Sequence, residues 1–259
     1  MLPPYLKSKL QKLEKFDMPQ NIFYGQTDIG LKRENNEDVF LLNSDQGFCL
    51  TADGMGGAAA GELASKIFAD TAQEIFEGQS DRSQKEVLYR VQQTFRVANQ
   101  KILEHIVQNT SHKGMGCTAE LLAFSDEGFI LGHMGDSRTY RLREGKFEQL
   151  TQDHTLVQQQ LEDGLISEDQ IRHHPLRNII YRAVGIKHEL SLELIIGQTA
   201  AQDLFLLCSD GLTDMIMDDQ IQDILGLDND IHRQVEELID EAKAAGGNDN
   251  ITVVLVAIT

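Results

Sequence analysis

The sequence has no tryptophan and only four prolines and three cysteines among its 259 residues. The cysteines, Cys49, Cys117 and Cys208, are odd in number, widely spaced and without a CxxC pair, which argues against a disulfide framework. Each lies within an apolar run, so we expect buried free thiols. Unpaired thiols are typical of a reducing compartment, and they predict a cytoplasmic protein.

Long apolar runs and an excess of basic residues are also missing. No apolar run reaches the roughly 18 residues that a membrane helix requires, and the N-terminus lacks the apolar segment of a signal peptide. The 23 basic residues are outnumbered by 41 acidic ones, which gives a formal net charge of -18. Because such a field opposes binding to nucleic acids and to anionic lipids, we expect neither partner. A hydrophobic content of 41% predicts a soluble globular protein, and a monomer is the expected state.

Residues 1–20 differ in composition from the rest of the chain and are predicted to form an N-terminal extension. They hold three of the four prolines, and Leu6, Leu10 and Leu13 recur at helical spacing. Either a short amphipathic helix or a loosely ordered tail accounts for this pattern.

Residues 21–259 are predicted to form a single domain with a polar insertion at about 154–185. Apolar residues that recur every three or four positions indicate helices, and short apolar runs indicate strands. Strands and helices come in blocks rather than in βαβ alternation, which predicts an α+β fold with mostly antiparallel sheets. The predicted strands are 21–27, 39–43, 48–52, 118–124, 129–133, 139–142, 190–196, 204–208 and 251–258, and the predicted helices are 61–76, 83–109, 218–225 and 231–244.

Acidic residues recur at the ends of these predicted strands, most of them beside glycine. A single Asp-Gly pair is most often a turn, but strand ends of an antiparallel sandwich can converge at one rim. Carboxylates gathered there repel each other strongly unless a cation lies among them. Oxygen ligands without clustered histidine or cysteine favour Mg²⁺ or Mn²⁺ over Zn²⁺. The residues concerned are Glu37, Asp38, Asp53, Asp136, Asp210 and Asp249.

Six short motifs, taken in order, carry a family resemblance. They read RENNED, ADGMGG, GDSR, LTQDH, SDGL and GGNDNIT. This ordered set resembles the metal-dependent protein phosphatases, the PPM or protein phosphatase 2C-like family, in its bacterial serine/threonine branch. The resemblance covers roughly residues 22–259. It implies a central antiparallel β-sandwich flanked by helix pairs, in α-β-β-α layers, with the stretch 154–185 as a mobile flap.

The resemblance also implies a metal centre. Two Mn²⁺ or Mg²⁺ ions would activate a water that attacks a phosphate monoester in line. Asp53 would bridge both ions, and Asp136 would bind a third ion together with Asp210. Glu37 and Asp38 would complete the ligand set directly or through water, with Asp38 as the nearer contributor. The implied ligands are Asp38, Asp53, the carbonyl of Gly54, Asp136, Asp210 and Asp249.

Arg33 of the RENNED motif would bind the substrate phosphate, because its planar fork matches two phosphate oxygens. Without the other motifs, Arg33 would be assigned a surface salt bridge with Glu34 or Glu37. The family resemblance implies a phosphoprotein substrate that carries phosphoserine or phosphothreonine. A cognate serine/threonine kinase is a further implied partner.

The sequence leaves the general acid open and allows two other functions to be considered. Some relatives carry a histidine as general acid where this chain has Met55 and Ala58, so the general acid stays unassigned, and His133 is expected to be a packed strand residue. A catalytically inactive phosphatase fold that acts as a regulatory binding partner would be signalled by loss of Arg33 or a metal aspartate, and none is missing. A serine hydrolase is disfavoured because Ser137 does not lie in a GxSxG motif.

Overall fold

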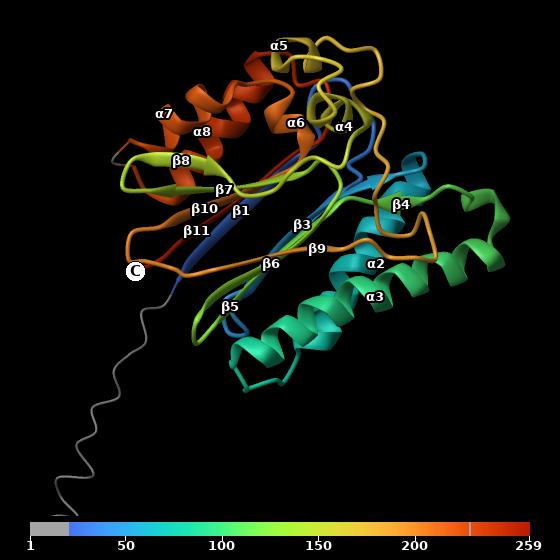
Figure 1. The fold of residues 1–259 in the computed structure, drawn as a ribbon, viewed down its shortest axis with the longest axis horizontal. Coiled ribbons are helices and arrows are strands. Elements are labelled where there is room, and N and C mark those ends of the chain that lie inside the picture. The colour runs from blue at the N-terminus through green and yellow to red at the C-terminus, as the bar shows by residue number, and fades with distance from the viewer. Residues whose placement is uncertain (1–20, 228) are drawn as a thin grey trace, which may run out of the picture.

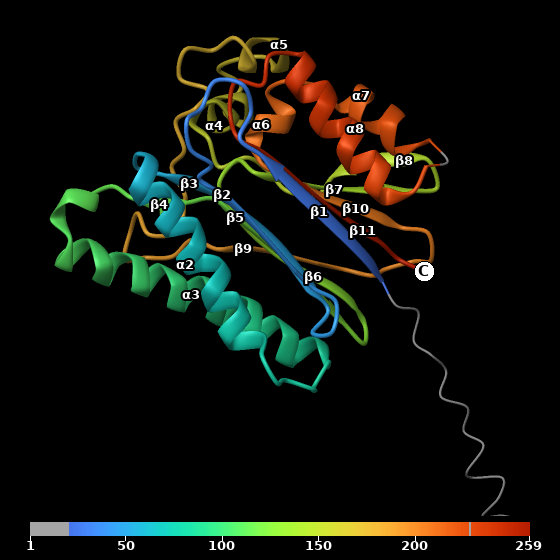
Figure 2. The same ribbon diagram turned by 180° about the vertical axis from the view of Figure 1, so that it is seen from behind.

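The fold consists of two antiparallel β-sheets packed face to face, with helices covering both outer faces (Figure 1 and Figure 2). The structure is a computed structural model that describes residues 21–227 and 229–259. The expectations for the extension 1–20 therefore lie outside the described residues. Every pairing between the strands of the described chain is antiparallel, which confirms the predicted α+β sandwich.

Each sheet has its own strand order, and the two ends of the described chain lie in the first sheet. The first sheet runs β1 (Ile22–Asp28), β11 (Ile251–Ala257), β10 (Leu204–Cys208), β7 (Arg138–Arg143) and β8 (Lys146–Gln149). The second sheet runs β2 (Asp38–Asn43), β3 (Phe48–Met55), β5 (Ala119–Ser125), β6 (Gly128–Met134) and β9 (Glu193–Gly197), and the short β4 (Gly116–Cys117) pairs with β3.

Two groups of helices enclose the sheets, and a third group lies at one end (Figure 1). The second sheet is covered by α2 (Ala58–Phe76) and α3 (Gln84–Gln108), and the first by α6 (Asp210–Thr213), α7 (Asp218–Leu225) and α8 (Ile231–Ala244). The remaining elements are α4 (Leu156–Glu162), α5 (Glu168–Ile171) and the 3-10 turn η1 (Thr110–His112). Within the described ranges, no helix combines the length and the apolar character needed to cross a membrane.

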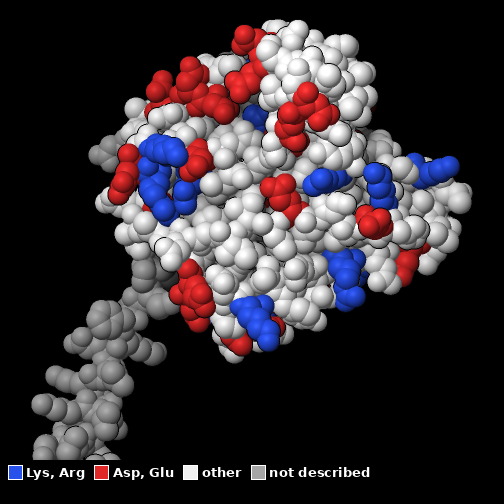
Figure 3. Space-filling view, viewed as in Figure 1, with Lys and Arg blue, Asp and Glu red and all other residues white. Residues whose placement is uncertain are grey.

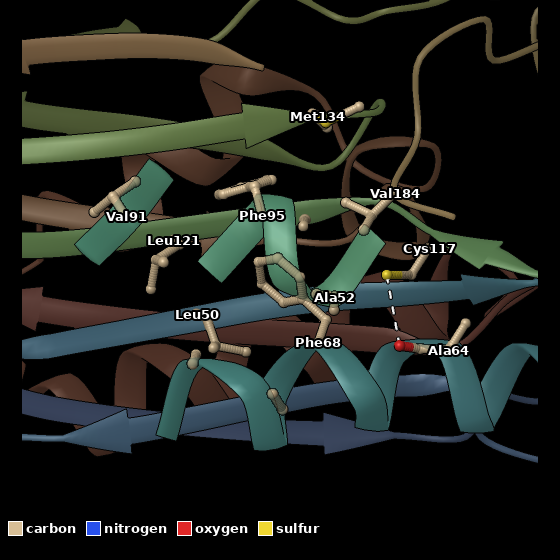
Figure 4. Packing of buried hydrophobic residues seen from close by; sticks show 14 of the residues in the cluster. Leu50, Ala52, Ala64, Phe68, Val91, Phe95, Cys117, Leu121, Met134 and Val184 are labelled. Atoms are coloured by element: carbon tan, nitrogen blue, oxygen red, sulfur yellow. Dashed lines mark hydrogen bonds between the residues drawn. The ribbon is translucent and has the colours of Figure 1, made fainter. Parts of the chain in front are cut away.

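Three apolar layers hold the sandwich together. Leu50 of β3 packs with Phe68 of α2 and Phe95 of α3 in the layer beneath the helices (Figure 4). Cys49, the neighbour of Leu50, belongs instead to the layer between the two sheets, because successive side chains of a strand point to opposite faces. A third layer joins the first sheet to α7 and α8, where Leu238 is fully buried. Central strands are therefore buried on both faces.

The predicted elements are confirmed with small shifts at their ends. Strand β3 continues to Met55 rather than stopping at residue 52, since Gly54 and Met55 pair with β4. Helix α2 begins three residues earlier than predicted. Neither β4 nor α6 was predicted, because segments of two and four residues are too short to show a periodic pattern. All three cysteines are buried and free, as expected.

The charged side chains are unevenly distributed over the face shown in Figure 3. Acidic side chains gather on the upper part of the face in Figure 3, around the helix α7, which carries Asp218, Asp219 and Asp223. Basic side chains form a smaller patch on the β7–β8 hairpin, where Arg141 and Lys146 both lie near Glu148.

Candidate metal centre

Asp38 and Asp53 face each other across two neighbouring strands. Asp38 begins β2 and pairs in register with Asp53 of β3. Asp38 is only 6% exposed, and its Oδ2 accepts hydrogen bonds from Ser209 Oγ at 2.7 Å and Thr252 Oγ1 at 2.6 Å. Thr252 lies in β11 of the other sheet and Ser209 directly follows β10 of that sheet, so the two hydroxyls fix Asp38 at the rim where the sheets meet. Burial raises the pKa of Asp38 to about 6, although the two hydroxyl hydrogen bonds act to lower it.

Thr118, just before β5, holds Asp53 in place. The Asp53 N–H donates to the Thr118 hydroxyl at 3.1 Å, and the Thr118 N–H donates to the Asp53 carbonyl at 2.9 Å. Thr118 Oγ1 also shares a hydrogen bond of 2.7 Å with Ser137 Oγ. Burial raises the pKa of Asp53 well above its ordinary value, and the charges of Asp38 and Asp210 raise it further. The Asp53 carboxylate is thus on a rigid strand and surrounded by other carboxylates.

Glycines at positions 54 and 61 allow β3 to approach the first turn of α2. A Cβ atom on Gly54 would lie 2.2 Å from the Gly61 carbonyl oxygen, and one on Gly61 would lie 1.8 Å from Oε2 of Glu37. The Gly54 N–H donates to the Glu37 carbonyl at 3.2 Å, and Ser65 Oγ donates to the same carbonyl at 2.6 Å. The Gly54 backbone is therefore held beside Asp53 with no side chain in the way.

Asp136 and Asp210 bring two further carboxylates to the same rim. Asp136 follows β6 and is 9% exposed, and Asp210 follows β10 as the first residue of α6. Burial, followed by the charge of Asp153, raises the pKa of Asp136 to about 7. Burial, followed by the charge of Asp136, raises the pKa of Asp210 well above its ordinary value. Asp136 is therefore close enough to Asp210 for its charge to oppose the ionisation of Asp210.

Asp249 lies just before β11 and forms an ion pair with Arg33. The distance from Arg33 Nη2 to Asp249 Oδ2 is 2.6 Å, and the Arg33 side chain is half exposed. The pairing of Arg33 with Glu34 or Glu37, which the sequence allowed as a simple alternative, does not occur. The hydrogen bond from Arg33 to Asp249 raises the pKa of the guanidinium further, so Arg33 is charged.

Asn250 fixes the loop that carries Arg33. Its Oδ1 accepts a hydrogen bond from the Glu37 N–H at 2.8 Å. Its Nδ2 donates to the carbonyls of Ile29 at 3.1 Å and Asn35 at 2.9 Å. A Cβ atom on Gly211 would lie 1.8 Å from the Asn250 carbonyl oxygen, so the SDGL motif needs glycine at this close approach.

Three carboxylate oxygens in this cluster are buried without a hydrogen-bond donor among the described residues. They are Oδ1 of Asp38, Oδ1 of Asp136 and Oδ1 of Asp210. Buried acceptors are normally satisfied, and buried charges are normally paired or bound to metals. The cluster offers oxygen ligands only, which fits a hard divalent cation such as Mn²⁺ or Mg²⁺.

The structure brings all the predicted aspartates to one rim, together with four residues that sequence reasoning missed. Ser209 stands directly before the Asp-Gly pair of SDGL, and Asn250 and Thr252 lie within GGNDNIT, so these motifs contained a signal. Thr118 had no such signal, because it acts through its contact with Asp53 in a distant segment.

The polar stretch 154–185 lies beside the rim and contains α4 and α5. Its two ends meet, because Thr155 and Ile180 form an antiparallel bridge. A cleft of about 590 Å³ lies between this stretch and helices α6 and α7, and Asp136 and Asp210 line its wall. The cleft gives a ligand access to the carboxylate cluster.

His133 is a fully buried strand residue, as the sequence predicted. Its Nδ1 pairs with the buried Glu120 carboxylate, and its Nε2 bonds to the Gln152 carbonyl at 2.8 Å. Burial acts to lower the pKa of His133, but the Glu120 charge and the hydrogen bonds to Glu120 and Gln152 together raise it to about 9. Since both ring nitrogens are engaged, His133 does not supply a proton at the rim.

Comparisons with known proteins found similar sequences and similar structures that cover most of this chain. The family model described as protein phosphatase 2C matches residues 31–254. Protein phosphatase PhpP of Streptococcus pneumoniae is 37% identical over 236 residues, covering 90% of this chain and 95% of that protein. The crystal structure of the Mycobacterium tuberculosis serine/threonine phosphatase PstP/Ppp has a TM-score of 0.86 at 34% identity, covering 92% of this chain and 98% of that one. A PstP catalytic domain in complex with two manganese ions has a TM-score of 0.84 at 32% identity, covering 92% and 98%.

Proposed function

Because this chain belongs to the protein phosphatase 2C family, we propose that the carboxylate cluster at the rim is the metal centre of its phosphatase activity. The protein is a serine/threonine protein phosphatase that depends on Mn²⁺ or Mg²⁺. The observation that carries the assignment of the site is the set of three buried carboxylate oxygens without donors, on Asp38, Asp136 and Asp210.

The proposed ligands come from both sheets. Asp53 lies among the other carboxylates and would hold the ions together with the Gly54 carbonyl, Asp210 and Asp249. Asp38 would contribute its Oδ1, which has no donor among the described residues. Asp136 and Asp210 line the cleft and would hold a further ion there.

The bound ions supply a water of lowered pKa and neutralise charge on the phosphoryl oxygens. Arg33 binds the substrate phosphate, for which it is placed at the exposed side of the cluster beside Asp249. Apart from the Asp249 contact, the guanidinium makes no hydrogen bond to the described part of the chain, so its other nitrogens are free to bind phosphate oxygens. Ser209 and Thr252 hold Asp38 with one oxygen turned away from them, which leaves that oxygen for an ion.

The substrates are phosphoproteins, and further properties follow as proposals. A cognate serine/threonine kinase supplies the phosphorylated residues that this enzyme hydrolyses. The free, buried cysteines support a reducing, cytoplasmic location. We also propose that the enzyme acts as a monomer.

Hydrolysis assays with matched variants test the metal site. Wild-type protein, Asp210→Ala and the surface control Asp126→Asn are compared on p-nitrophenyl phosphate and a phosphothreonine peptide, with Mn²⁺ and with EDTA. Asp126 is exposed in the turn between β5 and β6. We expect Asp210→Ala to lose more than about 100-fold in activity, because changes to outer-shell residues alone cost 10–100-fold. Full activity of Asp210→Ala would remove Asp210 from the site. Full activity of wild type in EDTA would contradict the dependence on a metal ion.

The alternative of an inactive phosphatase fold with a regulatory role is not supported, because the relatives of this chain are named as serine/threonine phosphatases. The presence of Arg33 and of every proposed aspartate at one rim supports an active enzyme instead.

A further inference from the structure

His154, the last residue of the LTQDH motif, binds a single residue of the GDSR turn through two hydrogen bonds. The His154 N–H donates to the Gly135 carbonyl at 2.7 Å, and the Gly135 N–H donates to the ring Nδ1 of His154 at 3.1 Å. Gly135 directly precedes Asp136 in the chain. His154 is 3% exposed, so these hydrogen bonds are shielded from water. Both backbone polar groups of Gly135 are thereby held by one histidine.

Thr118 limits the movement of the Gly135 turn away from His154. Gly135 has a φ of 122°, and a Cβ atom there would lie 2.5 Å from the Thr118 Cβ. Thr118 is the residue that holds both backbone groups of Asp53. The turn therefore lies between His154 on one side and the support of Asp53 on the other, and this sets the position of Asp136 relative to Asp53.

His154 is also the point at which the stretch 154–185 leaves and rejoins the body of the protein. The Tyr181 N–H donates to the His154 carbonyl at 3.0 Å, and the Leu156 N–H donates to the Ile179 carbonyl at 2.8 Å. The ring of His154 is stacked on that of His133, with centroids 4.4 Å apart. The same histidine thus anchors the Asp136 turn and both ends of the stretch.

The tautomer of His154 follows from its surroundings. Burial, followed by the charges of His133 and Arg182, lowers the pKa of His154 to about 3, so the ring is neutral. Because Nδ1 accepts the Gly135 N–H, the ring proton is on Nε2, which lies 3.0 Å from Glu193 Oε2. Glu193 is therefore the acceptor that maintains this tautomer.

His133, His154 and Glu193 have the residue types and proximity of a transition-metal site. Each ring nitrogen already has a hydrogen-bond partner, and Nη1 of Arg182 lies 3.3 Å from His154 Nε2, where its positive charge opposes a cation. The cluster is better explained as a support for neighbouring elements than as a metal site.

We propose that His154 is a positioning residue that couples the stretch 154–185 to Asp136, and thereby controls ion binding at the Asp136–Asp210 position. This proposal rests on the assignment of Asp136 as a metal ligand. His154 touches neither substrate nor ion; it acts through the Gly135 turn. A change in the stretch 154–185 would reach Asp136 through His154.

Two isosteric substitutions separate the contacts of the ring. In His154→Asn, the side-chain oxygen takes the place of Nδ1 and can accept the Gly135 N–H. In His154→Gln, the amide nitrogen takes the place of Nε2 and can donate to Glu193, but no acceptor faces Gly135. His154→Ala removes both contacts. The exposed His188, which lies beside α3, supplies the control His188→Asn.

Mn²⁺ titration calorimetry and limited trypsin digestion of the full chain provide readouts besides activity. We expect His154→Ala and His154→Gln to lose about 10–100-fold in affinity at the weakest Mn²⁺ position, as outer-shell changes do. The Mn²⁺ affinities of His154→Asn and His188→Asn are expected to stay within about 3-fold of wild type. This corresponds to a change of at most roughly 0.7 kcal/mol in binding free energy. Cleavage at Arg172 and Arg177, within the stretch, is expected to accelerate in His154→Ala.

Two results overturn the proposal. One is wild-type Mn²⁺ affinity together with wild-type cleavage in a folded His154→Ala. The other is a folded His154→Asn that is as impaired as His154→Ala, since the Gly135 bond would then not carry the effect. If the variants do not fold, the nitrogen–nitrogen coupling between the Gly135 amide and His154 Nδ1 is measured by NMR in wild type. Its presence supports the contact, and its absence overturns the proposal.

The same titrations separate this inference from the assignment of the site. Wild-type protein that binds no Mn²⁺ contradicts the metal centre itself. Wild-type protein that binds Mn²⁺ and loses it in Asp210→Ala, while all His154 variants bind normally, contradicts only the positioning role.

Discussion

Replacement of Asp136 by asparagine should stabilise the metal-free protein while it weakens the enzyme. Asparagine keeps the shape of the side chain but removes a charge that is buried without a donor on Oδ1. Because burial and the charge of Asp153 raise the pKa of Asp136 from 3.8 to about 7, the ionised form is disfavoured in the folded state. A difference of about three pH units corresponds to about 4 kcal/mol at full ionisation.

The sign of the pH dependence follows from proton binding. A carboxyl group whose folded pKa is raised binds more protons in the folded state, so stability falls as the pH rises between the unfolded and folded values. For Asp136 this window runs from about pH 4 to about pH 7. The lowered pKa of His154 makes stability rise with pH over part of this range. His154 is present in both proteins, so its contribution cancels when their stabilities are compared.

Urea unfolding in EDTA at pH 4, 5.5, 7 and 8.5 measures this difference. We expect no stabilisation of Asp136→Asn near pH 4 and a gain of several kcal/mol, up to about 4, above pH 7. Saturating Mn²⁺ should reverse the order, because it stabilises wild type more than the variant. The exposed control Asp126→Asn should show no pH-dependent difference. An Asp136→Asn protein that is less stable than wild type at pH 8.5 in EDTA would refute the reasoning.

Three further substitutions test other contacts at the rim. Gly211→Ala should cost roughly 2–4 kcal/mol of unfolding free energy, because its Cβ would lie 1.8 Å from the Asn250 carbonyl oxygen. Gly226→Ala, at a φ of -78°, should change urea stability by less than about 0.5 kcal/mol; equal losses in both variants would contradict this steric argument. Asn250→Ala should cost roughly 3 kcal/mol by leaving three backbone groups unpaired, and should raise the KM for a phosphopeptide by loosening the Arg33 loop; an unchanged KM would show that the loop is held otherwise. Arg33→Lys should raise the KM for p-nitrophenyl phosphate about 10-fold, because an ammonium group lacks the planar fork; unchanged kinetics would remove Arg33 from the phosphate site.

Most secondary structure could be read from the sequence because each element is amphipathic or apolar along its own length. Helix α8 and strand β10 have the predicted boundaries, since the stripe of α8 and the apolar run of β10 are both bounded by polar residues. The exceptions depend on distant partners. Strand β3 extends to Met55 only because β4 pairs with its end, and that pairing joins segments that are far apart in the chain.

The carboxylates of the proposed site could also be found, because acidic residues recur at several strand ends and lie within ordered motifs that resemble a known family. Their supports could not. Ser209 is 171 residues away from Asp38, and Thr252 is 214 residues away, so no local pattern connects them. The same applies to the ion pair of Arg33 with Asp249, which spans 216 residues and replaced the nearby partners that the sequence offered.

By itself, the sequence determined the class of fold, the order of its elements and the acidic residues that we propose as ligands, because these depend on periodicity, composition and motif order. The tertiary structure alone decided which carboxylate oxygens are left without donors, how far each pKa is raised, and that His154 contacts the residue next to Asp136. These properties depend on burial and on the distance between charges, and both exist only once the two sheets have brought separate segments to the same rim.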